Sequence, residues 1–127
     1  MKEFLIDTNI FVRLLTKEPL SHYEEARKIF KQIEEEKHYG LVSILVINEI
    51  LWVLERFYKM KRSIFIPKII HLLLLDNVRI VEVSKDMLIE ILQKMQKKKI
   101  DFTDVYLAEI AQSRKVLSFD KDLEKLN

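Results

Sequence analysis

The sequence predicts a three-layer α/β/α sandwich, in which a central parallel sheet of about four or five strands is covered by helices on both faces. Short apolar segments of strand length alternate along the chain with longer segments of helical periodicity, and this alternation is typical of parallel sheets. The 127 residues include one glycine and two prolines, so we expect long helices and short turns. No repeat, linker or change in composition divides the chain, so residues 1–127 are interpreted as one domain.

One strand and one helix are predicted near the beginning of the chain. Residues 3–6 form a short apolar segment, which is interpreted as a buried strand that stops at Asp7. The capping-box pattern Ser-x-x-Glu at 21–24 predicts a helix that ends near His38. The buried face of this helix is expected to contain Ala26, Ile29, Phe30 and Ile33.

The middle of the chain predicts a second strand and two apolar helices. Residues 40–43 are interpreted as the strand, and Ser43 then caps a strongly apolar helix that runs to about Tyr58. Residues 63–75 are interpreted as another apolar helix, in which Pro67 is tolerable only in the first turn.

The last part of the chain predicts two strands separated by two helices. Residues 78–83 are the third strand, residues 86–97 form an amphipathic helix, and Asp101 opens the next helix. Residues 115–119 are the last strand, which Asp120 follows directly. The inward faces are Leu88, Ile91, Leu92 and Met95 on the first helix, and Val105, Ala108, Ile110 and Ala111 on the second.

The composition is that of a globular protein, with 49% hydrophobic and 33% charged residues. The absence of cysteine excludes disulfide frameworks, thiolate zinc sites and cysteine catalysis, and agrees with the cytoplasm, where we expect the protein to act. We expect no signal sequence and no membrane span, because the longest apolar segment is interrupted by Pro67, Lys68 and His71. A net charge of +2 permits a polyanionic partner without requiring one.

Two aspartates follow predicted strands at the edge where parallel sheets form their sites. Asp7 follows the first strand and Asp120 follows the last, so parallel strands place both at the same edge. Each aspartate alone is explained as well by capping the next helix. The two together indicate a shared site.

Three further acids lie on predicted helices. The helical neighbours of Glu49 are the apolar residues at 45, 46, 52 and 53, so its carboxylate is either at the edge of the core or paired with a cation. Asp101 fits the N-cap of its helix, and Asp104 lies in the first turn, where a carboxylate interacts favourably with the helix dipole. A first-turn carboxylate also points out over the sheet edge.

A cluster of oxygen ligands favours the binding of a hard cation, Mg²⁺ or Mn²⁺. The three histidines show no zinc spacing, and a single glycine rules out Gly-rich phosphate loops and the G-x-S-x-G motif. Cations held by shared carboxylates activate water and stabilise an in-line phosphoryl transition state, so such an enzyme needs no nucleophilic side chain.

Four segments in order along the chain resemble the PIN-domain family, and more closely its VapC-like toxin branch. They are FLIDTNIFVRLL at 4–15, VINEILWVL at 46–54, DFTDVYLAEIA at 101–111 and VLSFDKDL at 116–123. The resemblance implies that a set of four catalytic acids holds Mg²⁺ or Mn²⁺, with Asp101 as a less constant fifth. The four are Asp7, Glu49, Asp104 and Asp120.

The same resemblance implies a substrate and partners. The substrate is RNA, the chain forms a homodimer, and a cognate antitoxin protein binds it. Thr8, Asn9 and Ser118 match polar positions that help to arrange the pocket, although threonine is more usual than serine at the last of these. Arg13 and Lys121 are candidates for contacts with substrate phosphates, whereas the run Lys97–Lys99 is also explained as a solvated helix end.

The sequence argues against two other classes of function and leaves two open. An aspartyl phosphatase needs a second acid two positions after the first, where this chain has Asn9. A phospho-receiver domain needs an aspartate at a central strand end, where this chain has Val83 and Ser84. A PIN-like scaffold that only binds RNA or protein and a housekeeping RNA-processing nuclease are the remaining alternatives. The helix around 64–75 is apolar on more than one face, which indicates either complete burial or an interface.

Overall fold

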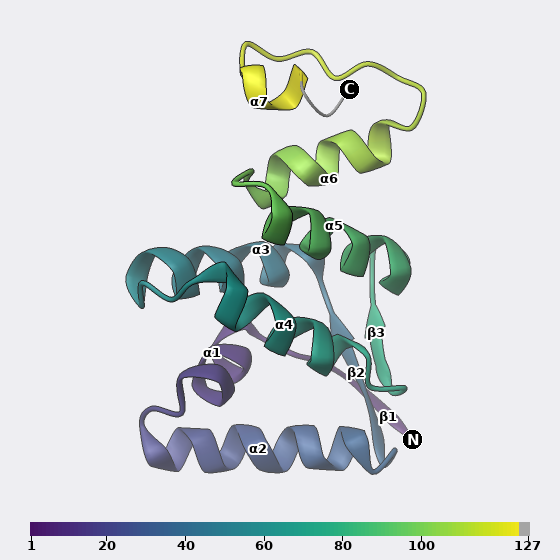
Figure 1. Ribbon diagram of the computed structural model, residues 1–127. Coiled ribbons are helices and arrows are strands. Elements are labelled where there is room, and N and C mark those ends of the chain that lie inside the picture. The colour runs from purple at the N-terminus through teal and green to yellow at the C-terminus, as the bar shows by residue number, and fades with distance from the viewer. Residues whose placement is uncertain (125–127) are drawn as a thin grey trace.

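A computed structural model describes residues 1–124 of the chain. Its elements alternate between strands and helices, as the sequence predicts, and the helices predominate (Figure 1). In chain order they are β1 Lys2–Leu5, α1 Thr8–Thr16, α2 Leu20–Glu34, β2 His38–Val42, α3 Ile44–Trp52, the π-helix η1 Val53–Phe57, α4 Arg62–Leu73, β3 Val78–Ile80, α5 Lys85–Lys97, α6 Phe102–Ala111 and α7 Lys121–Glu124.

The sheet is parallel and has the order β1-β2-β3. Phe4 pairs with Gly40, and Gly40 pairs with Val78, so β2 is the central strand. The predicted α/β class and parallel sheet are therefore confirmed. The strand number is three within the described residues, rather than four or five.

The predicted last strand at 115–119 is wrong for the structure described here, because no strand forms there. The chain leaves α6 through Gln112, whose φ of 56° lies in the left-handed region. The following segment runs away from the sheet and towards α7 (Figure 1). A strand needs a neighbour for its backbone, and this path takes residues 115–119 away from β1.

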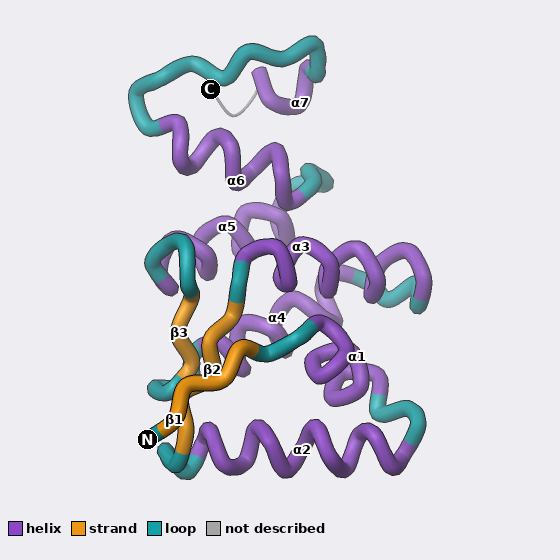
Figure 2. Tube along the Cα trace, turned by 180° about the vertical axis from the view of Figure 1, so that it is seen from behind, coloured by secondary structure: helices purple, strands orange, loops and turns teal. Residues whose placement is uncertain are grey.

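The two faces of the sheet differ in burial. Alternate side chains project to opposite faces, and on one face Gly40, Val42 and Val78 are buried beneath helices. On the other face Leu5 is 74% exposed, and the strands lie in front of the helices in Figure 2. The predicted strand at residues 3–6 is found as β1, which ends at Leu5, but its predicted burial is wrong, because β1 is an edge strand with one neighbour and its residues are exposed. Ile6, which follows the strand directly, is buried.

The core is one cluster of buried side chains, to which β2, β3, η1 and each of the helices α1 to α6 contribute. The amphipathic pattern predicted for α5 is confirmed, because its four predicted inward residues are all buried. In α4, Ile64 remains exposed, as does Leu74 at the C-cap, so this helix is not completely buried. Pro67 is the sixth residue of α4, beyond the first turn where it was predicted to be tolerable. The carbonyl that loses its donor belongs to Ser63, which is exposed and therefore accessible to water.

Three predicted helix boundaries have different outcomes. Ser43 caps α3 as predicted, because its hydroxyl accepts a hydrogen bond from the backbone N–H of Leu45 at 3.2 Å. The helix then continues through η1 to Phe57, which agrees with the predicted end. In α2, however, Ser21 lies inside the first turn rather than at the N-cap, and Ile29 is 39% exposed rather than buried. None of the described helices combines the length and apolar character that a membrane span requires.

Candidate functional site

Asp7 stands between β1 and α1, where the sequence placed it. It is the N-cap residue of α1, and its Oδ1 accepts a hydrogen bond from the backbone N–H of Thr8 at 2.8 Å. Thr8 is buried, whereas Asp7 and Asn9 are exposed. Asp7 therefore caps α1, which is the alternative role considered for it, and its carboxylate nevertheless remains accessible at the end of β1.

Glu49 lies on an exposed flank of α3. Of the apolar neighbours that suggested a position at the core, Leu45 and Trp52 are themselves exposed. The alternative of a surface glutamate describes this environment, because the carboxylate stays in water without the desolvation that burial would impose. Its exposure leaves it open to a ligand.

Asp101 and Asp104 differ in their surroundings. Asp101 occupies the N-cap position of α6, but its side chain makes no capping hydrogen bond, which corrects the predicted role. Its Oδ1 lies 3.5 Å from Nη2 of Arg62 instead. Asp104 is half-buried in the first turn of α6, as the sequence predicts. Asp101 therefore has a structural partner that the sequence did not reveal.

Asp120 follows the segment that departs from the sheet. Its backbone N–H donates a hydrogen bond to the hydroxyl of Ser118 at 2.9 Å, and Asp120, Ser118 and Lys121 are all exposed. The segment lies on the far side of α6 from β1 (Figure 1). The expected proximity of Asp120 to Asp7 at one sheet edge is therefore not seen in this structure.

The elements that carry the other three acids are neighbours. Helix α1, which begins after Asp7, packs on α3, which carries Glu49, and α3 packs on α6, which carries Asp104. Nevertheless, among the side chains that the structure describes, no three acids or histidines are grouped closely enough to hold a metal ion. The donor atoms suit Mg²⁺ or Mn²⁺ by type, but they do not form one coordination sphere in this arrangement. The assignment of the four acids as ligands stays a prediction.

The two predicted phosphate contacts lie in different settings. The guanidinium of Arg13 donates to the carbonyl of Glu18 at 3.2 Å and approaches the hydroxyl of Tyr58 at 3.4 Å. It stands at the other end of α1 from Asp7, about 9 Å along the axis for a rise of about 1.5 Å per residue. Lys121 is exposed beside Asp120.

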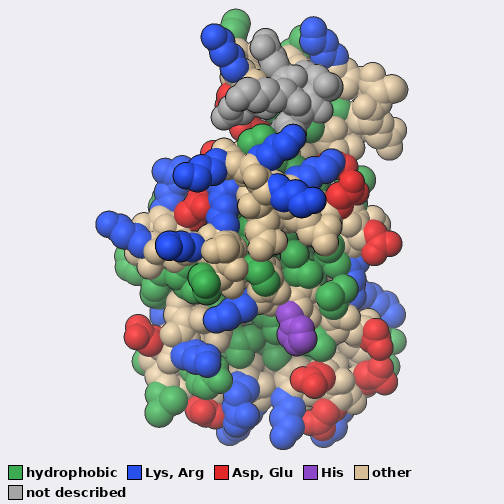
Figure 3. Space-filling model, in the orientation of Figure 1, with side chains coloured by type: hydrophobic (Ala, Val, Ile, Leu, Met, Phe, Trp, Pro, Cys, Tyr) green, Lys and Arg blue, Asp and Glu red, His purple; other side chains and the backbone are tan. Residues whose placement is uncertain are grey.

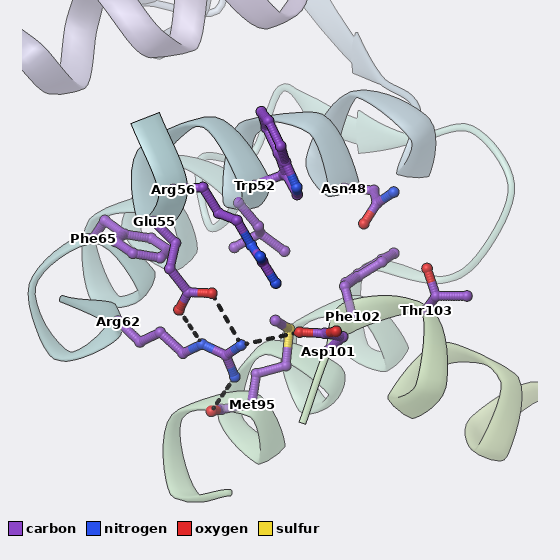
Figure 4. A pocket seen from close by; sticks show the side chains of 11 residues that line it. Asn48, Trp52, Glu55, Arg56, Arg62, Phe65, Met95, Asp101, Phe102 and Thr103 are labelled. Carbon is purple, nitrogen blue, oxygen red and sulfur yellow. Dashed lines mark hydrogen bonds and ion pairs between the residues drawn. The ribbon is translucent and has the colours of Figure 1, made fainter. Parts of the chain in front are cut away.

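A hollow of about 190 Å³ opens beside Asp101 (Figure 4). Trp52 and Arg56 come from α3 and η1, and in the close-up the guanidinium of Arg56 reaches towards Asp101. Arg62 also lines the hollow. The eleven lining residues are Asn48, Leu51, Trp52, Glu55, Arg56, Arg62, Phe65, Met95, Asp101, Phe102 and Thr103.

The guanidinium of Arg62 binds several acceptors around this hollow. It donates to the carboxylate of Glu55 and to the carbonyls of Met95 and Ile100, the last at 2.8 Å. The hydrogen bond from Arg62 lowers the pKa of Glu55, burial opposes this effect, and the positive charges of Arg62 and Arg56 lower it further. The net result is a Glu55 carboxylate whose pKa lies below its ordinary value.

Sequence reasoning missed this hollow and its residues. Trp52 was considered only as an apolar neighbour of Glu49. A signal was present, because Asn48, Trp52 and Arg56 follow one another at intervals of four and so share one helix face. The contribution of Arg62 had no comparable signal, because its acceptors at residues 95 and 100 are more than thirty positions away.

A family model for the PIN domain matches residues 4–127 of the chain. The match includes all four predicted acids and the segment that departs from the sheet. No protein of curated function and no solved structure matches the chain.

Proposed function

The chain belongs to the PIN domain family, and on that premise we propose that it is an Mg²⁺- or Mn²⁺-dependent endoribonuclease that hydrolyses RNA phosphodiester bonds. The fold is of a nuclease type. The observation that carries the proposal is the family match across residues 4–127, with an acid at the end of β1, on α3, at the start of α6 and after the departing segment. Asp7, Glu49 and Asp120 are exposed and Asp104 is half-buried, so a ligand can reach each of them.

The proposed ligands are Asp7, Glu49, Asp104 and Asp120. They do not share a coordination sphere in the described arrangement, so the proposal requires the segment that carries Asp120 to approach β1. The exposed side chains of Leu5, Leu117 and Phe119 support such a movement, because it would remove apolar surface from water. Asp101 is placed outside the ligand set, because it pairs with Arg62.

The biological role that we propose is that of a cytoplasmic toxin which a cognate antitoxin restrains. The four sequence segments shared with the VapC-like branch support it. The exposed apolar residues Ile64 of α4 and Leu74 at its C-cap offer a surface for a second copy or for the antitoxin. Production in a bacterial host should arrest growth for the wild type, and an Asp7→Asn variant should not. A housekeeping RNA-processing nuclease would leave growth unchanged while still cleaving RNA in vitro.

A second candidate function is a PIN-like scaffold that binds RNA or protein without cleaving it. The lack of a grouped set of acids in the described residues favours this reading. Incubation of the purified protein with RNA, in Mn²⁺ and in excess EDTA, distinguishes the two.

We expect cleavage in Mn²⁺ and none in EDTA. Asp7→Asn keeps the shape of the side chain but removes its charge, and it should reduce the rate about 100-fold or more. Asp86→Asn is the matched control, because Asp86 is an exposed acid in the first turn of α5, away from the predicted set. Cleavage that persists in EDTA, or equal losses in the two variants, would overturn the assignment.

A further inference from the structure

The indole ring of Trp52 is exposed to solvent beside the hollow that Arg56 also lines. Trp52 is 59% exposed, although tryptophan gains more from burial than most side chains. Asn48 and Arg56 flank it on the same helix face, and all three line the hollow (Figure 4). A volume of about 190 Å³ exceeds the space of roughly 30 Å³ that a single water takes in the liquid. The hollow therefore offers a flat aromatic surface, an amide and a cation to one ligand.

Arg62 connects the parts of the chain that surround this hollow. Its hydrogen bonds join η1, through Glu55, to the end of α5 and to the loop before α6, through the carbonyls of Met95 and Ile100. The helix that carries Trp52 continues as the π-helix η1 over Val53–Phe57, and π-helical turns inside α-helices are frequently found at functional sites. Trp52 is thus presented by a fixed scaffold rather than by a loop.

Basic side chains from two parts of the chain lie near the hollow. Arg56 belongs to η1 and lines the hollow, Lys59 and Lys61 follow η1, and Lys97–Lys99 begin at the last residue of α5. The two groups are neighbours because Arg62 also lies 3.5 Å from the carbonyl of Lys98. All six are exposed, and Figure 3 shows lysine and arginine side chains gathered over this part of the face. We call these six residues the basic rim.

The two acids that line the hollow offset the charge of the rim only in part. Glu55 and Asp101 both pair with Arg62, which is not part of the six, and Arg56 is the rim cation that Glu55 also attracts. Lys94 of α5 is bound to Glu109 of α6 and to Glu90, so it is not free to join the rim. The rim thus keeps a surplus of positive charge next to an exposed aromatic ring. Grooves that bind single-stranded nucleic acid combine these two features, because the cations contact phosphates and the ring stacks on a base.

We propose, on the basis of the RNA cleavage proposed above, that the hollow and its basic rim bind an unpaired stretch of RNA. One base stacks on Trp52, the amide of Asn48 faces the edge of that base, and Arg56 and the rim lysines contact the neighbouring phosphates. An acidic protein segment would also match the charge of the rim, but it would leave the indole ring without a stacking partner. Asp101, Phe102 and Thr103 line the hollow, so this subsite lies next to the start of α6, which carries Asp104, one of the four predicted acids.

The fluorescence of the protein tests the proposal directly, because Trp52 is the single tryptophan of the chain. The full chain is titrated in EDTA, which prevents metal-dependent cleavage, with a short oligouridylate and a short oligoadenylate. Stacking of a base on the indole should quench its emission. Inorganic polyphosphate and polyglutamate carry similar charge without bases, and neither should quench it. Quenching by polyglutamate equal to that by RNA would indicate an acidic protein partner and overturn the proposal.

Two pairs of variants separate stacking from charge. Trp52→Leu should raise the dissociation constant of a fluorescently labelled oligonucleotide about 10-fold, the loss expected for one stacked base. Phe57→Leu is its control, because Phe57 is an aromatic residue of η1 that is more exposed than Trp52, at 73% against 59%, and does not line the hollow. Arg56→Gln should reduce the slope of log affinity against log salt by about 0.7, the value for one phosphate contact on a single strand. Lys31→Gln, an exposed lysine of α2, should leave that slope unchanged.

The outcomes distinguish this subsite from the proposed nuclease activity. Quenching by RNA without any cleavage in Mn²⁺ supports the subsite and contradicts the nuclease. Cleavage in Mn²⁺ with unchanged tryptophan emission, and with equal affinities for Trp52→Leu and wild type, overturns the subsite and keeps the nuclease. Thermal melts of each variant establish that it is folded, which we expect because all four substituted side chains are exposed.

Discussion

The guanidinium of Arg62 and the carboxylate of Glu55 face one another through two hydrogen bonds. Nε of Arg62 lies 2.6 Å from Oε2 of Glu55, and Nη2 lies 3.3 Å from Oε1. The pair connects the first residue of α4 to the π-helix η1, seven positions earlier. Because Nη1 of the same guanidinium donates to the carbonyls of Met95 and Ile100, one side chain fixes three parts of the chain around the hollow.

We predict that Arg62→Ala lowers the free energy of unfolding by about 2–3 kcal/mol, because it leaves a half-buried carboxylate and two carbonyls without their donor. Arg27→Ala is the control. Arg27 forms a comparable pair with Glu24 at 3.3 Å, but both side chains are exposed, so its loss should change stability by about 0.5 kcal/mol or less. Chemical denaturation of the three proteins measures the difference. Equal losses in the two variants would contradict the structural role of Arg62.

The free energy of unfolding should depend on pH through the ionisation of Glu55. Its pKa in the folded state is lowered from 4.5, mainly by the hydrogen bond from Arg62. A lowered pKa means that the ionised pair stabilises the fold fully above 4.5, and that this contribution is lost as the pH falls through the folded value. Unfolding free energies of wild type and Glu55→Gln should therefore differ at pH 6 and converge in the acid range. A difference that is independent of pH would exclude an ionic contribution from Glu55.

Helices with a regular apolar stripe could be predicted from the sequence alone. In α5, the residues at 88, 91, 92 and 95 define a single face, and all four are buried. The cap at Ser43 was also predictable, because it depends on a hydrogen bond to a residue two positions away. These features are local, so tertiary packing does not change them. Ile29 shows the limit of the same pattern, because its burial depends on how closely the chain packs over α2.

The predicted strand at 115–119 depends on a neighbour that the sequence does not specify. Its apolar residues favour a strand, but the left-handed turn at Gln112 directs the chain away from β1. The same turn explains why the position of each acid was predictable while their convergence was not. Asp7 lies at an element end because of local signals, whereas the place of Asp120 depends on the path of the whole segment before it. The hollow beside Trp52 was unpredictable for a related reason, since Arg62 joins residues distant in sequence.

The single glycine of the chain is predicted to be sensitive to a methyl group. A Cβ at Gly40 would lie 2.7 Å from Cδ1 of Ile6 and 2.9 Å from Cδ1 of Ile33, and both isoleucines are buried. Gly40→Ala should therefore reduce stability by about 1–3 kcal/mol through overpacking. Adding Ile33→Val removes one of the two methyl groups in conflict. The double variant should be more stable than the sum of the single effects by about 0.5 kcal/mol or more.

The matched control for this coupling combines Gly40→Ala with Ile91→Val. Ile91 is buried on α5, and none of its atoms is among those nearest to the added Cβ. Its effect should add to that of Gly40→Ala. Coupling of equal size in both double variants would show that Gly40→Ala loosens the whole core, rather than acting through a steric clash with Ile33.

The open edge of β1 gives the last prediction, which concerns how the proposed metal site forms. β1 is hydrogen-bonded only to β2 in the sheet of the described residues, so its other edge is available for a further strand. Leu117 and Phe119 are exposed and two positions apart, so in a strand they share one face. A parallel strand at 115–119 beside β1 would end at Asp120, at the edge where Asp7 follows β1. Mn²⁺ shared by the two carboxylates would favour this arrangement over the one described.

Hydrogen exchange measures that movement without relying on catalysis. Addition of Mn²⁺ should slow the exchange of amides in β1 and in residues 115–119 about 10-fold or more, because new backbone hydrogen bonds protect them. Asp120→Asn removes a ligand charge and should abolish the change, whereas Asp86→Asn should retain it. If Mn²⁺ supports RNA cleavage while exchange in both segments stays as it is in EDTA, the metal site must form without a fourth strand. Asp120 would then lose its place among the ligands, because the described path keeps it on the far side of α6 from β1.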